Sequence, residues 1–298
     1  MKIILTLLGI LISVSAGAQA DRFDKVEIKT TRLTQNLYML EGEGGNIGVS
    51  AGDDGIFVID DQFAPLTARI LAAIKAISDK PVRFLINTHW HFDHAGGNEN
   101  FGRAGVVIVA QDNVRKRLSN KTAIDFFKSS YGPTAPIGLP VITFKDTMTF
   151  HLNGDEVTAL HAPNAHTDGD SIIHFHNANV VHTGDTYFNG LYPFIDTGTQ
   201  GSVKGVIAAA NRVLAITDDT SKIIPGHGPL SNKSEIKAYR DMLVAVYANV
   251  ARMVKAKKTL AQVLAAKPTK DYDAKWGNGF LKPDQFVEIV YTSATKEK

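Results

Sequence analysis

The chain has 298 residues, of which 44% are hydrophobic and 21% charged, with a formal net charge of +2 and no cysteine. This is the composition of an ordinary globular protein, and the near-zero charge without Lys/Arg runs argues against RNA, DNA or another polyanion as a partner. Without a thiolate, any metal site in the chain must be built from His, Asp and Glu.

The first twenty residues, MKIILTLLGILISVSAGAQA, have the pattern of a secretory signal peptide. Lys2 gives the positive start, residues 3–14 the apolar run, and Ala18-Gln19-Ala20 the small-residue cleavage site. The apolar run is too short to span a bilayer comfortably. We therefore expect cleavage after Ala20, a secreted or periplasmic protein without a stable membrane anchor, and a single domain over residues 21–298.

The first half of the mature chain begins with short β-like runs separated by glycines. A helical apolar period follows over 65–77, and the apolar strand 82–86 then leads into a histidine cluster. The expected strands before the helix are 26–30, 37–40, 47–51 and 56–59.

The second half repeats this order, with a loop or insertion near the surface over 120–138 between the halves. After its strands come a helix at 203–215, a strand at 222–224, a helical stretch over 233–265 and a last helix from Pro283. Strands first and helices after, given twice, predict two β-rich layers packed together with helices outside. The expected strands of this half are 142–144, 148–152, 157–161, 172–175 and 180–182.

The stretch THWHFDHAGGN, residues 88–98, places four residues of metal-ligand type, three His and one Asp, within six positions. His89 and His91 alternate, so in extended backbone they would point to one side, with Asp93 next in that period. His94 breaks the alternation and can turn towards a different centre. We interpret the stretch as serving two metal ions, for which imidazole and carboxylate ligands suit zinc, iron or manganese.

Three further ligand-type residues lie in loops at strand ends, where functional sites are usually built. His166 lies in HAPNAHTDGDS, Asp185 in HTGDTYF after an apolar strand, and His227 in the turn IIPGHGP.

Together these motifs resemble the metallo-β-lactamase fold superfamily over nearly the whole mature chain. The resemblance implies an α/β (α+β) fold, a four-layer αββα sandwich with the metal site at one edge between the sheets. It also implies that Asp60, at the end of a strand, supports a histidine ligand from behind. The implied ligands are His89, His91 and His166 for the first ion, Asp93, His94 and His227 for the second, and Asp185 bridging both.

The chemistry implied by this resemblance is hydrolysis with two Zn²⁺ ions, iron and manganese being alternatives. Two ions a few ångströms apart lower the pKa of a shared water, and the hydroxide attacks a carbonyl carbon. Asp93 is expected to orient that hydroxide. The residues expected in a pocket for a small-molecule substrate, because they neighbour ligands in sequence, are Trp90, Asn164, Phe188, Asn189 and Tyr192.

Several activities share these ligands. Export favours β-lactamase activity and antibiotic resistance, although one major lactamase class has a cysteine where this chain has Asp185, and a lysine soon after it. Here the next lysine is Lys204. The alternatives are a lactonase or a glyoxalase II-like thioesterase, an RNA phosphodiesterase, which the low charge disfavours, and a non-hydrolytic iron protein. Hydrolysis of a β-lactam amide is the leading expectation; the sequence leaves the oligomeric state open.

Overall fold

A computed structural model describes residues 22–296 of the chain. The expected signal peptide lies outside the described residues. Within residues 22–296, no helix is long and apolar enough to cross a membrane.

The first sheet contains seven strands in the order β1-β2-β3-β4-β5-β6-β9. Neighbours from β1 to β4 are antiparallel, whereas β4, β5, β6 and β9 run parallel. The parallel strands β4 and β5 are rich in Val, Ile, Leu and Phe, as expected of strands covered on both faces. The strands are β1 (Lys29–Arg32), β2 (Leu37–Glu41), β3 (Ile47–Gly52), β4 (Gly55–Ile59), β5 (Val82–Asn87), β6 (Val107–Gln111) and β9 (Ile142–Phe144).

The second sheet contains five strands in the order β10-β11-β12-β13-β14. All neighbours are antiparallel except β13 and β14, which run parallel. The strands are β10 (Thr147–Leu152), β11 (Asp155–His161), β12 (Ser171–Phe175), β13 (Val180–His182) and β14 (Lys222–Ile224).

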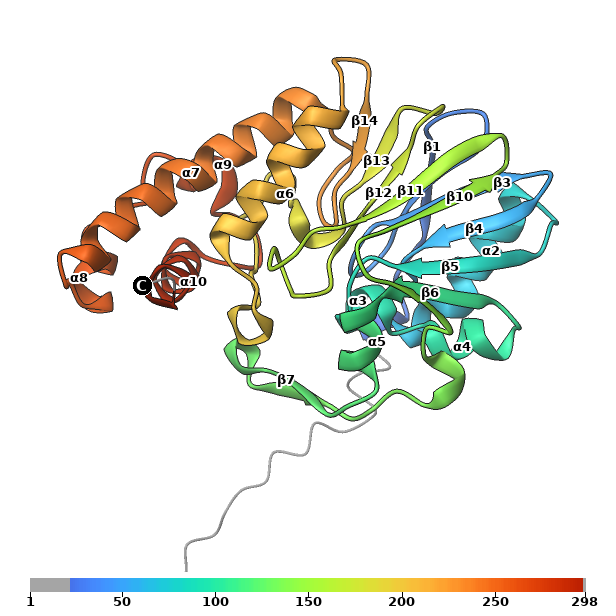
Figure 1. Ribbon diagram of the computed structural model, residues 1–298, viewed down its shortest axis with the longest axis horizontal. Coiled ribbons are helices and arrows are strands. Elements are labelled where there is room, and N and C mark those ends of the chain that lie inside the picture. Colours follow the sequence, from blue (N-terminus) through green and yellow to red (C-terminus); the bar gives the residue numbers. More distant parts are fainter. Residues whose placement is uncertain (1–21, 297–298) are drawn as a thin grey trace, which may run out of the picture.

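The two sheets pack face to face, and helices cover both outer faces (Figure 1). Between the sheets lies an apolar core in which Phe57 and Ile86 of the first sheet meet Phe175 and Ile224 of the second. Helices α2 (Thr67–Ile77) and α4 (Asn98–Arg103) cover the first sheet. The second sheet is covered by α6 (Val203–Ile216), α7 (Lys233–Lys255) and α10 (Pro283–Lys296). This is the αββα sandwich that the sequence predicts.

Several elements differ from the sequence-based expectation. Strand β6 and helix α5 (Asp112–Leu118) were not expected, although the apolar run 106–110 has the length of a strand. The long helix α7 ends at Lys255, and a turn separates it from α8 (Leu260–Ala265). Thr259 starts α8 through a capping box with Gln262, which satisfies the free amides of a new helix.

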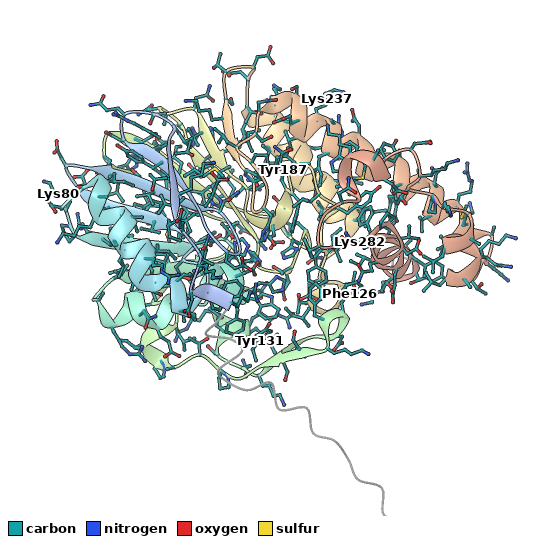
Figure 2. The ribbon with its side chains drawn as sticks, turned by 180° about the vertical axis from the view of Figure 1, so that it is seen from behind. Lys80, Phe126, Tyr131, Tyr187, Lys237 and Lys282 are labelled. Carbon is teal, nitrogen blue, oxygen red and sulfur yellow. The ribbon has the colours of Figure 1, made fainter. Side chains whose placement is uncertain are left out.

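The segment between α5 and β9 contains a small hairpin and leaves the sandwich. Its parts are β7 (Thr122–Ile124), a 3₁₀ turn over Asp125–Phe127, and β8 (Ser129–Tyr131). The hairpin lies below the sandwich in Figure 1, and Figure 2 labels Phe126 and Tyr131 on it. The sequence-based expectation of a loop or insertion therefore holds, with local pairing that its short runs did not reveal.

The order of the strands brings the ligand-bearing loops together. Strands β4 and β5 are parallel, so the residues after Ile59 and Asn87 emerge at the same edge of the first sheet. Strands β13 and β14 are also parallel, and β12 runs opposite to them. The loops after β13 and β14 and the loop before β12 therefore meet at the facing edge of the second sheet.

Candidate metal centre

Seven side chains from these loops converge in two groups. Each member offers one ligand atom, and within a group these atoms all lie within 4.8 Å of one another. We call His89, His91, His166 and Asp185 the first donor group, and Asp93, His94 and His227 the second donor group.

The local backbone explains how one short stretch supplies both groups. His91 is extended, with φ −65° and ψ 148°, and helix α3 (Phe92–Ala95) begins directly after it. Asp93 and His94 therefore lie on the first turn of a helix. The strict alternation through Asp93 that the sequence suggested does not continue, because the helical turn carries Asp93 to the other group.

The first donor group is buried and its ligand atoms face one another. Nδ1 of His91 lies 2.9 Å from Nε2 of His166, and Oδ2 of Asp185 lies 3.5 Å from that Nε2. Nε2 of His89 lies 3.9 Å from the same carboxylate oxygen. The four side chains thus point at a common position.

The second donor group is arranged around His227 and lies nearer to solvent. Nε2 of His227 is 3.2 Å from Oδ2 of Asp93 and 3.4 Å from Nε2 of His94. The side chains of His227 and Asp93 are 19% and 28% exposed, so this group opens towards the cavity described below.

Asp185 connects the two groups. Its Oδ1 lies 3.0 Å from Nε2 of His94, while its Oδ2 lies 3.5 Å from Nε2 of both His166 and His227. One carboxylate therefore faces ligand nitrogens of both groups.

Four of the histidines are held by a hydrogen bond at the ring nitrogen that faces away from the centre. Nδ1 of His94 donates to Asp60, and Nδ1 of His166 donates to the carbonyl of Phe194, at 2.7 and 2.8 Å. Nδ1 of His89 lies 3.1 Å from the Thr88 hydroxyl, which itself donates to Asp60. These bonds fix the tautomers that leave the inward nitrogens free as ligands.

The fourth histidine held in this way is His91, and its contact with Asp196 was not expected from the sequence. Nε2 of His91 lies 3.2 Å from Oδ2 of Asp196, a residue that is buried and more than a hundred positions away. Oδ1 of Asp196 accepts from the amides of Gly198 and Thr199, which holds the carboxylate in place. The one signal in the sequence was an aspartate in an apolar run, YPFIDTG, and it does not point to His91.

The electrostatics of the two donor groups differ. Burial lowers the pKa of His89 well below its usual value, and it lowers the pKa of His166 to about 4. Burial would also lower the pKa of His227, but Asp185 and Asp93 outweigh it and raise that pKa to about 9. Near pH 7 the imidazoles of His89 and His166 are therefore neutral, whereas the imidazole of His227 is protonated on both nitrogens and positively charged.

The residues fit a divalent metal ion at each group. Nε2 of His89 is buried and has no hydrogen-bond partner among the described residues, which is costly unless an ion takes that role. Imidazole nitrogens and carboxylate oxygens are ligands of the zinc, iron and manganese type.

Two glycines allow the ligands to approach the backbone. A Cβ at Gly45 would lie 2.1 Å from the His94 ring, and a Cβ at Gly226 would lie 2.0 Å from Oδ1 of Asp185. Any larger residue at either position would displace a ligand.

A cavity of about 460 Å³ opens onto the donors. Its floor contains His91, Asp93, Asp185 and His227. Its walls are mainly aromatic: the residues other than ligands are Arg22, Gly44, Phe63, Phe92, Ile124, Phe127, Tyr131, Phe188, Phe194 and Phe280.

Of the five residues expected in the substrate pocket, Phe188 lines this cavity and the other four do not. Trp90 is buried beside His91, because a residue between two alternating ligands points the opposite way. Tyr192 is buried against Phe286, and its hydroxyl donates to Asp273.

The two asparagines in that set face elsewhere. The side chain of Asn189 donates to the carbonyl of Pro229, so it is not aimed at an oxyanion in the cavity. Asn164 has a φ of 51° and borders a separate cavity with Lys204. Sequence neighbourhood to a ligand is therefore a weak guide to the pocket.

The αββα sandwich carries this donor set at the facing edges of its two sheets. The family model of the metallo-β-lactamase superfamily matches residues 30–227. The chain belongs to the metallo-β-lactamase superfamily.

Similar proteins within this superfamily differ in their named activities. A linear primary-alkylsulfatase of Pseudomonas sp. is 26% identical over 275 residues, covering 80% of this chain and 48% of that protein. A probable hydroxyacylglutathione hydrolase of Schizosaccharomyces pombe is 29% identical over 201 residues, covering 64% of this chain and 67% of that protein. The chain thus spans about half the length of the first relative and two thirds of the second.

Among solved structures, a metallo-β-lactamase from Pontibacter korlensis matches with a TM-score of 0.61 and 18% sequence identity. The match covers 73% of this chain and 99% of that one, and at this identity it shows the shared fold.

Proposed function

We propose that this protein is an exported dinuclear zinc hydrolase that cleaves an ester-type bond, in a lactone or a thioester, of a small molecule. The observation that carries the proposal is the position of Asp185, whose two carboxylate oxygens lie within 3.5 Å of ligand nitrogens from both donor groups. Such a shared carboxylate supports two ions side by side rather than one ion alone.

The first and second donor groups would each hold one divalent ion, and such a pair, when bound, would supply an activated water and polarise the carbonyl under attack. The protein's own contribution is to aim and orient. Asp93 lines the cavity, and although burial would raise its pKa, His94 and His227 hold that pKa well below its usual value. Its carboxylate is therefore ionised near neutral pH and accepts a hydrogen bond from the attacking water, which orients the water towards the substrate.

The cavity supports an ester-type bond over the β-lactam amide that the sequence favours. A β-lactam antibiotic carries a carboxylate that needs a cationic partner. Lys204 borders a different cavity. Among the described residues that line the metal cavity, the basic side chain other than the donor histidines is that of Arg22. Its guanidinium already donates to Glu43 at 3.0 and 2.7 Å. The similarity to a probable hydroxyacylglutathione hydrolase, an enzyme named for a thioester substrate, supports the same choice.

The test is hydrolysis by the mature chain, residues 21–298, loaded with zinc and assayed with and without a chelator. We expect chelator-sensitive turnover of γ-thiobutyrolactone or a simple acyl thioester, and at least tenfold lower kcat/KM on a chromogenic cephalosporin. The Asp185→Asn variant, which keeps the side-chain shape, is expected to lose turnover and zinc together. Faster turnover of the cephalosporin would move the bond class to β-lactam amides, and turnover of none of these compounds would contradict the proposal.

A further inference from the structure

The walls of the metal cavity carry aromatic side chains from two segments outside the sandwich. Phe127 lies in the 3₁₀ turn of the hairpin segment, and Phe280 lies in the loop before α10. Both line the cavity, and they are 45% and 52% exposed. We call them the aromatic mouth.

Each residue of the aromatic mouth is backed by another ring. The ring centres of Phe127 and Phe194 lie 4.7 Å apart, and those of Phe280 and Phe188 lie 6.1 Å apart. Phe188 in turn stacks on the ligand His227, with ring centres 5.0 Å apart and planes 16° apart. A continuous aromatic surface therefore runs from the solvent to the second donor group.

Covering an exposed phenyl ring removes apolar surface from water, and this burial contributes favourable free energy to binding. Two such rings at the rim of one functional cavity indicate a site where an apolar group of a ligand binds. Phe92 and Tyr131 extend this surface, because their rings stack 3.9 Å apart on the cavity wall.

The charge around the cavity also favours an uncharged substrate group. The Arg22 guanidinium donates to Glu43 and lies over the ring of Phe63, 5.1 Å from its centre. Its charge thus already has an anionic partner at the protein surface, and its flat face adds to the aromatic wall.

We infer that the substrate carries an uncharged apolar acyl group, either an alkyl chain of several carbons or an aryl group. Phe127 and Phe280 contact this group and determine the specificity for it. The inference rests on the proposed hydrolytic function and names its substrate class. Each buried methylene contributes enough transfer free energy for about a fourfold change in affinity. Because the mouth is open to solvent, we expect kcat/KM to rise by about 50-fold over six methylenes.

The first experiment measures kcat/KM of the zinc-loaded protein for p-nitrophenyl esters from acetyl to octanoyl, with the glutaryl ester as an anionic match for pentanoyl. We expect the octanoyl-to-acetyl ratio to be near 50 and pentanoyl to exceed glutaryl by at least tenfold. Phe127→Ala and Phe280→Ala should each reduce the octanoyl-to-acetyl ratio at least fivefold. The matched control is Val244→Ala, which changes an equally exposed apolar residue on α7 and should leave the ratio unchanged.

A second variant, Glu43→Gln, removes the anionic partner of Arg22 and is expected to shift the preference towards the anionic substrate. In Glu43→Gln the guanidinium loses its anionic partner, so the glutaryl ester should gain at least threefold relative to pentanoyl. A flat chain-length profile in the wild type, or a preference for glutaryl, would overturn the inference while leaving the hydrolytic function in place.

Binding separates the inference from the reaction. Octanohydroxamate and acetohydroxamate share a metal-binding head, and calorimetry on the zinc-loaded protein compares their Kd without any turnover. If no ester is cleaved but octanohydroxamate binds at least tenfold more tightly, and Phe127→Ala removes that difference, the apolar acyl site stands and the proposed reaction falls. Equal affinity of the two hydroxamates would overturn the apolar acyl site.

Discussion

The Asp60 carboxylate accepts a hydrogen bond from Nδ1 of His94 at 2.7 Å, and both side chains are fully buried. The same carboxylate accepts from the amide and the hydroxyl of Thr88, and that hydroxyl faces His89. Asp60 therefore orients one histidine of each donor group. Its backbone has a φ of 62°, a left-handed conformation that costs about 1–3 kcal/mol and is retained where a functional site requires it.

Replacing Asp60 by Asn should weaken zinc binding at both donor groups. The amide nitrogen cannot accept, so either the bond from the Thr88 amide or the two bonds from the Thr88 hydroxyl and His94 are lost. Outer hydrogen-bond partners of this kind are worth about 10–100-fold in metal affinity. Competition with a chromophoric chelator measures the two affinities, and wild-type values for both would contradict this role of Asp60.

The Asp196→Asn variant should affect the first donor group alone. Asn can still accept from the amides of Gly198 and Thr199, so the turn should persist and Tm should change little. It cannot fix the Nε2–H tautomer of His91, and the affinity of the first ion should fall by about 10–100-fold. If the affinity of the second ion fell equally, a general structural effect would replace the specific contact with His91.

Metal binding should release protons unequally at the two groups. The pKa of His166 is about 4, so the proton is already absent at pH 7, whereas the pKa of His227 is about 9 and its proton must leave before an ion binds. Affinity for the second ion should therefore rise with pH up to about 9, by about tenfold per unit for each proton displaced. The affinity for the first ion should depend less steeply on pH, because burial lowers the pKa of His89 and His166 and keeps both imidazoles neutral.

Zinc titration calorimetry in two buffers of different ionisation enthalpy measures this release at pH 7. We expect almost no proton for the first equivalent of zinc, and one to two for the second, because the carboxylates also raise the pKa of His94. Equal release for both equivalents would show that the two groups do not differ in protonation.

Gly226→Ala should remove zinc from the site, since the new Cβ would meet Oδ1 of Asp185 and the carbonyl of Gly184. Forcing a methyl group into such a space costs about 1–3 kcal/mol, which is about 5- to 150-fold in affinity when it displaces a ligand. Gly132→Ala is the matched control, because a Cβ there has no atom within 4 Å. Zinc content after dialysis and Tm distinguish the two variants, and equal zinc content would argue against this close approach.

The sequence predicted the layered fold and the ligand-type loops because both follow local rules. Apolar runs of strand length and a helical period gave two β-rich layers with helices outside, and ligand-type residues at strand ends gave the candidate donors. Their division into two groups came from the resemblance to the metallo-β-lactamase superfamily, and parallel pairing of the strands brings those ends to one edge.

The substrate cavity could not be predicted in this way. Trp90 and Tyr192 neighbour the motifs in sequence, but the alternation of side chains and the packing of Phe286 direct them into the core. Phe127 and Phe280 come from connecting segments whose path depends on the whole fold. Asp196 meets His91 through a contact between distant segments that no spacing rule describes.

The most direct test of the central claim is anomalous diffraction at the zinc edge from crystals of the zinc-loaded protein. Two anomalous peaks are expected, one among His89, His91 and His166 and one among Asp93, His94 and His227, with the Asp185 carboxylate between them. A single peak at either donor group, or two peaks that Asp185 does not contact, would contradict the dinuclear centre on which the proposed function rests.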